Sequence, residues 1–120
     1  MERFGGEEAV RRVATKLVEE CQAHAVLGVT HFLRVRKELL TERLVFMFKR
    51  MLERGELSEQ NKERLRAKHH EMNISAADFD HWTQTLGRVM NSCNIGVEGR
   101  LALLSAIASA KPCIVRPGKA

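Results

Sequence analysis

The stretch LRAKHHEMNISAADFD (residues 65–80) joins the end of a basic segment to the start of an apolar one. His69 lies five residues before Ile74 and ten before Phe79. Ser75, followed three residues later by Asp78, is typical of a capping box, in which two side chains bond the free N–H groups at a helix start. The stretch predicts a polar helical segment with a histidine near its end, followed closely by a second helix.

That second helix is expected to be apolar on one side. Its apolar residues recur at three- and four-residue spacing, which is the helical period, and Asn94 to Gly96 interrupts the pattern: Phe79, Trp82, Leu86, Val89 and Met90. A further helix is predicted from Val97 to Ala110, with Leu101, Leu103, Leu104 and Ile107 buried. Pro112 to Ala120 is expected to be a tail.

Before residue 65 the sequence predicts two more apolar helices and a polar one. Ser58 to Met72 contains few apolar residues, so its stability is expected to depend on what it packs against. A helix from about Arg36 to Arg54 carries so many apolar residues that it should be covered on more than one side, and Gly55 is its expected end.

The first helix is expected to begin at Gly5–Gly6 and to end near His24 to Gly28. Glu7 and Glu8 suit the positive end of the helix dipole. One apolar stripe follows: Val10, Val13, Ala14, Leu17, Val18 and Cys21. Because no proline occurs before Pro112, nothing forbids helix along this length, and an all-α fold is predicted.

Composition indicates one folded domain. The 120 residues suffice for one core, and 44% hydrophobic with 29% charged residues argues against disorder. The net charge of +5 favours anionic partners, but there is no tyrosine for base stacking, so nucleic-acid binding rests on charge alone.

The cysteines and the amino terminus favour an intracellular, reducing compartment. Cys21, Cys93 and Cys113 are an odd set without paired spacing, and the first residues lack the apolar core of a signal peptide. No segment is long enough to span a membrane. Cytoplasm and organelle interior are not distinguished. Cys21 with His24 would supply only half a zinc site.

Two separated motifs carry a family resemblance. Phe4-Gly5-Gly6-Glu7-Glu8-Ala9-Val10 and the His69 stretch resemble the opening and the proximal-histidine region of truncated hemoglobins. The resemblance implies a truncated globin-like two-over-two helical sandwich over residues 1–120, holding haem b with His69 as the iron ligand. His70 lies about 100° around a helix from His69, so only one of the two should face inward.

The resemblance also implies the rest of a haem pocket. Val18 takes the place of the family's distal tyrosine, and Leu40 and Leu44 fall where polar distal residues are common. The other implied contacts are Phe32, Met47, Phe48, Ile74, Phe79 and Trp82, with Arg43, Arg66 and Lys68 as partners for the propionates. The family's second Gly-Gly motif is replaced by Glu53-Arg54-Gly55-Glu56.

The function implied is binding of a diatomic gas (oxygen, NO or CO) or redox chemistry through a histidine-ligated haem iron. Any enzymatic role would be haem-dependent, such as NO dioxygenation. The alternative is a haem-less globin-like structural or regulatory subunit of a larger protein assembly, which the apolar distal positions and the basic surface also suit. No Ser-His-Asp order or phosphate-binding glycine loop indicates hydrolysis or phosphoryl transfer.

Overall fold

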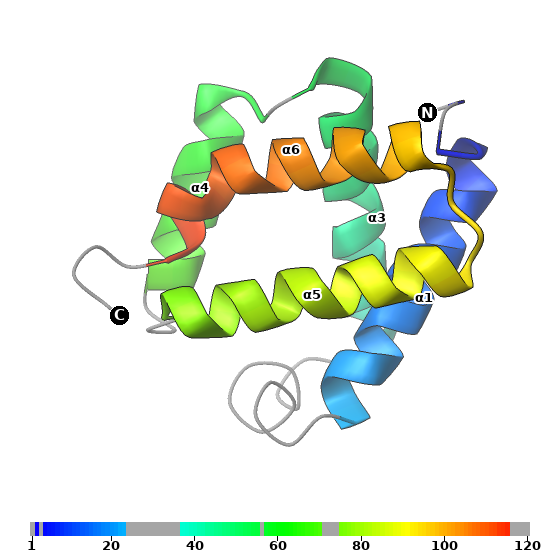
Figure 1. The fold of residues 1–120 in the computed structure, drawn as a ribbon. Coiled ribbons are helices and arrows are strands. Elements are labelled where there is room, and N and C mark those ends of the chain that lie inside the picture. The colour runs from blue at the N-terminus through cyan, green and yellow to red at the C-terminus, as the bar shows by residue number, and fades with distance from the viewer. Residues whose placement is uncertain (1, 3, 24–36, 56, 71–74, 116–120) are drawn as a thin grey trace.

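A computed structural model describes residues 2, 4–23, 37–55, 57–70 and 75–115; of Gln22, Ala23 and Lys68 to His70 it describes the backbone alone. These residues form five α-helices and no β-strand. The helices are α1 (Gly6–Ala23), α3 (Lys37–Arg54), α4 (Glu59–His70), α5 (Ala76–Ser92) and α6 (Val97–Ile114) (Figure 1). The all-α prediction is confirmed. None of the described helices is long and apolar enough to cross a membrane.

Two glycines determine where α1 begins. Gly5 has a φ of +112° and Gly6 a φ of +81°, which residues with a Cβ rarely adopt. The Gly5 N–H donates to the Glu2 carbonyl at 3.1 Å, closing a turn. Phe4, in that turn, is only 2% exposed and belongs to the core. The predicted start at Gly5–Gly6 is confirmed, and the two glycines allow the turn that precedes α1.

Two further helix boundaries follow local sequence signals. Gly55, with a φ of +79°, ends α3 and donates its N–H to the Met51 carbonyl at 2.8 Å. At the start of α5, the Ser75 Oγ accepts the Asp78 N–H at 3.0 Å and the Asp78 carboxylate accepts the Ser75 N–H at 3.3 Å. The end of the second helix and the capping box are both confirmed.

The prediction for the buried face of α6 is wrong at Leu101, which is 61% exposed. Leu103 and Ile107 are buried as expected, and Leu104 is half-buried. The physical reason is that α6 is apolar on nearly all sides, so its periodicity does not select a single inner face.

The tail does not begin at Pro112, because α6 continues to Ile114 with the proline inside it. Pro112 has no N–H to donate to the carbonyl of Ala108, but both residues are exposed and water can satisfy that carbonyl. Cys113 is buried, so the extra turn adds a core contact. The helix then ends with a bond from the Val115 N–H to the Lys111 carbonyl at 2.9 Å.

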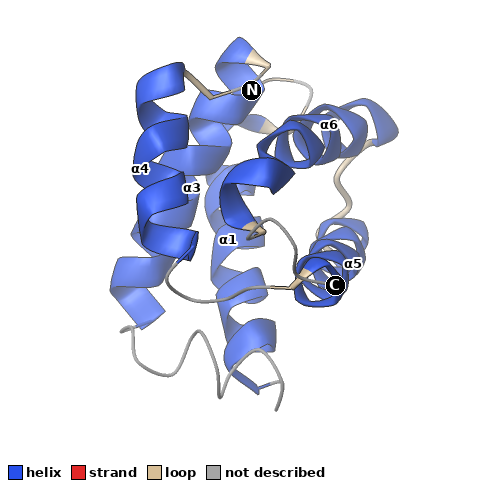
Figure 2. Ribbon diagram, turned by 90° about the vertical axis from the view of Figure 1, so that its left-hand side faces the viewer, coloured by secondary structure: helices blue, strands red, loops and turns tan. Residues whose placement is uncertain are grey.

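The helices pack as two crossed pairs with one helix added. α1 lies along α3, while α5 and α6 run across them, so that α1 contacts α5 and α3 contacts α6 (Figures 1 and 2). α4 packs on α6. The largest fully buried side chains come from four helices and the first turn: Phe4, Leu17, Phe48, Met51, Leu86, Met90, Leu103 and Ile107. The radius of gyration is 13.4 Å, close to the roughly 13.6 Å expected of a compact chain of this length.

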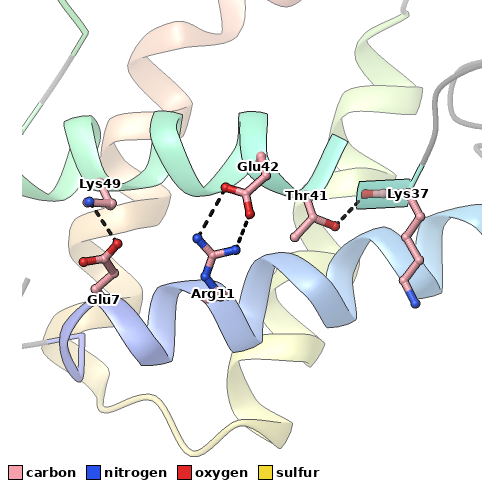
Figure 3. A network of polar contacts seen from close by, with 6 residues as sticks. All are labelled: Glu7, Arg11, Lys37, Thr41, Glu42 and Lys49. Atoms are coloured by element: carbon pink, nitrogen blue, oxygen red, sulfur yellow. Dashed lines mark hydrogen bonds and ion pairs between the residues drawn. The ribbon is translucent and has the colours of Figure 1, made fainter. Parts of the chain in front are cut away.

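Ion pairs border the α1–α3 contact. Lys49 Nζ lies 3.1 Å from a Glu7 carboxylate oxygen, and Arg11 binds Glu42 through both of its terminal nitrogens (Figure 3). The hydrogen bond from Arg11 holds the pKa of the Glu42 carboxyl below its ordinary value. Because these side chains are largely exposed, each ion pair contributes little to the stability of the fold.

Candidate functional site

Seven residues predicted to line a cofactor pocket lie in or against one apolar core. Val18 on α1, Leu44 and Phe48 on α3, and Phe79 on α5 are buried there. Three more are half-buried at its border: Leu40, Met47 and Trp82. Residues of three helices that are far apart in sequence therefore contribute to one apolar environment.

The spacing along α3 explains how it contributes. Leu40, Leu44 and Phe48 follow one another at four-residue intervals, which places them on one side of the helix. Met47 lies beside Phe48 at the edge of the same side. These four side chains form the α3 wall of the candidate site.

In the described part of the core, the buried hydroxyl groups are hydrogen-bonded within their own helices. Among the described residues, the buried polar side chains are Thr41 and Thr85. The Thr41 hydroxyl donates to the Lys37 carbonyl at 2.8 Å and the Thr85 hydroxyl to the His81 carbonyl at 3.0 Å. Both bonds stay within the residue's own helix, so neither hydroxyl is directed toward the apolar cluster.

α4 is a polar helix held by a few contacts. Leu57, just before it, is buried in the core, and Leu65 packs against the core's edge. Arg66 pairs with Glu63 on the same helix, and its guanidinium lies 3.7 Å from the Cys113 sulfur on α6. These contacts attach α4 to the edge of the core and to α6 before its last turn, which carries the histidines.

The structure does not describe the side chains of four of the predicted site residues. Lys68 and His69 belong to the last turn of α4, and their side chains lie outside what the structure describes. Phe32 and Ile74 lie outside the described residues altogether. The remaining predicted residue, Arg43, is exposed on α3.

Lys111 is a cation that the sequence did not single out. Its Nζ lies 5.6 Å from the centre of the Phe79 ring and 3.6 Å from an Asp80 carboxylate oxygen. The Phe79 and Trp82 rings are 6.5 Å apart. Lys111 is 31 residues from Asp80 along the chain, so no local pattern could have predicted that the positive charge meets the aromatic pair.

The cysteines supply no metal centre in the described part of the chain. No group of three potential ligands from His, Cys, Asp and Glu occurs there, and His24, the suggested zinc partner of Cys21, lies outside it. Burial raises the pKa of the Cys21 thiol to about 12, with a smaller contribution from Glu20. Cys21 is therefore a neutral core residue at physiological pH.

Comparisons with known proteins do not assign the chain to a family. No family model matches the sequence, no curated protein matches it, and no solved structure matches the fold.

Proposed function

We propose that this protein is a truncated-hemoglobin-like haem protein that binds a diatomic gas or transfers electrons, with His69 as the iron ligand. The observation that carries the proposal is the position of His69 at the end of the polar helix α4, shortly before the apolar helix α5. A polar helix held against α6 has His69 in its last turn, and a few residues later α5 brings Phe79 into the core and Trp82 to its border.

The described residues have the polarity and charge that a haem site requires. A porphyrin has apolar faces and an anionic edge, and Leu40, Met47 and Trp82 are apolar side chains that the fold leaves half-buried. Arg43 and Arg66 supply positive charge on the helices that flank the proposed site. The hydroxyls of Thr41 and Thr85 bond backbone carbonyls of their own helices, so the core around them remains apolar.

Each residue would have a simple task. His69 would hold the iron through a neutral imidazole nitrogen, and Arg43, Arg66 and Lys68 would pair with carboxylates at the edge of the group. Val18, Leu40 and Leu44 would exclude water without offering a hydrogen-bond donor. The haem would supply reversible gas binding or one-electron chemistry.

The second candidate is a haem-free structural or regulatory subunit. It is favoured by the packing of Val18, Leu44 and Phe48, which are 0%, 8% and 0% exposed without any added group. A core already filled by side chains needs no cofactor for stability.

Titration with hemin separates the two candidates. If the proposal is right, a Soret band grows to saturation at one equivalent of hemin, and unfolding shifts to higher temperature as expected for a ligand that binds the folded state. Absence of a saturable Soret band and an unchanged unfolding temperature would contradict the haem proposal and support the subunit.

A further inference from the structure

One side of α3 is left uncovered by the fold. Leu39 and Phe46 are large apolar residues seven positions apart, and they are 40% and 55% exposed. The sequence predicted that this helix would be covered on more than one side, but in the described structure its second apolar side has no neighbour over it. We call this side the outer face of α3, defined by Leu39, Arg43, Phe46, Arg50 and Arg54.

Arginines follow the apolar residues of the outer face along one edge. The Arg50 guanidinium lies over the Phe46 ring, 5.1 Å from its centre, which holds its planar nitrogens in place at the surface. Arg43 and Arg54 take part in no ion pair with the described residues, and both are exposed. Two other charges on the same helix, Glu42 and Lys49, are already paired with α1.

We propose that the outer face of α3 binds an acidic amphipathic helix of another protein. Apolar residues in the centre and arginines along one edge are complementary to a helix with apolar residues in its centre and carboxylates along its edge. Arginine forms planar paired hydrogen bonds with carboxylates, and aromatic residues and arginine are the common anchors of protein interfaces. The net charge of +5 would speed the approach of an acidic partner.

The face suits a protein helix better than a lipid surface. From Leu39 to Arg54 it extends about 22 Å along a straight helix, which matches a partner helix of similar length. Membrane association of a surface helix requires a larger apolar side than two residues provide.

The two proposals share Arg43, but the residues changed to test this inference lie outside the proposed haem site. Leu39, Phe46 and Arg50 lie away from the buried side of α3 that carries Leu44 and Phe48. Variants at Phe46 and Arg50 leave the haem candidates unchanged, so failure of one proposal does not bear on the other.

The test uses a fluorescent peptide of 18 residues, the length of α3, with leucines at seven-residue spacing and glutamates along one edge. Fluorescence anisotropy at low ionic strength should show saturable binding. Binding should weaken by about tenfold or more for Phe46→Ser and for Arg50→Glu, since loss of an anchor residue commonly costs this much. Arg64→Glu makes the same charge change at an exposed arginine on α4 and should alter binding by less than about twofold.

Several results would overturn the inference. Equal binding of a shuffled peptide with the same composition, or an equal loss with Arg64→Glu, would indicate general charge attraction. No binding of the amphipathic peptide would remove the proposed occupant. Stronger association with phosphatidylserine vesicles than with the peptide would assign the face to a membrane. A dimer in sedimentation velocity that Phe46→Ser dissociates would assign it to a second copy of the chain.

Discussion

Replacing Gly5 by alanine should destabilise the protein far more than the same change at Gly6. Both glycines have positive φ angles, +112° and +81°, so either alanine is strained, at about 1–2 kcal/mol for a left-handed residue. A Cβ on Gly5 would also lie 2.8 Å from the Ala9 Cβ, whereas a Cβ on Gly6 would meet no heavy atom within 4 Å.

The clash at Gly5 has no easy relief. Ala9 is buried in the first turns of α1, and its Cβ has no rotatable bond by which it could move away. The turn would have to shift, and Phe4 would leave its place in the core. The clash and the strain together should lower the free energy of unfolding by about 2–4 kcal/mol for Gly5→Ala, whereas strain alone should lower it by about 1–2 kcal/mol for Gly6→Ala.

Urea unfolding followed by circular dichroism measures both values, and Gly55→Ala is a further control because its φ is +79° and its surroundings are open. A Gly5→Ala variant no less stable than Gly6→Ala would refute the close approach to Ala9. It would also remove the structural explanation of the Phe4-Gly5-Gly6 motif.

Three further outcomes follow from local contacts. Ser75→Ala removes the capping bond to Asp78 and should lower the free energy of unfolding by about 1 kcal/mol in urea, whereas exposed Ser105→Ala should change it little. Burial raises the pKa of Cys21 from 9.0 to about 12, so the stability due to its neutral thiol is present below pH 9.0 and is lost progressively up to about pH 12. Thermal melts across this range should show wild type losing stability relative to Cys21→Ala. Because α4 has few apolar contacts, its amide exchange should be fast in the free protein and slow when hemin or a partner binds.

Each of these has a clear contrary result. Equal stabilities of the Ser75 and Ser105 variants would mean that the capping box does not hold α5. Parallel pH profiles for wild type and Cys21→Ala would show that the thiol ionises alike in the folded and unfolded chain. Equal protection of α4 with and without hemin would separate this helix from any binding site.

Helix boundaries were predictable where the signal is local. The capping box at Ser75 and the stop at Gly55 each involve residues within one helical turn of the boundary, so sequence spacing carries the necessary information. Buried residues were predictable where the apolar residues form one stripe, as on α1 and α5.

Prediction failed where the buried side or the end of a helix depends on its packing against other helices. α6 is apolar on nearly all sides, and only its contacts with α3, α4 and α5 decide that Leu103 is buried and Leu101 exposed. Pro112 stays helical because Cys113 finds a place in the core, which no rule about proline alone could foresee. In the candidate site, the apolar wall followed from periodicity, but Lys111 beside Phe79 results from the packing of α6 alongside α5.

The most direct test of the central proposal is a pair of hemin titrations on His69→Ala and His70→Ala, compared with wild type by the Soret band. Neighbouring positions on a helix differ by about 100° in direction, so only one of the two can serve as the iron ligand. We predict that His69→Ala abolishes stoichiometric binding and that His70→Ala leaves the spectrum unchanged. The opposite pattern would assign the ligand to His70, and stoichiometric binding that survives both changes would contradict a haem held at the end of α4.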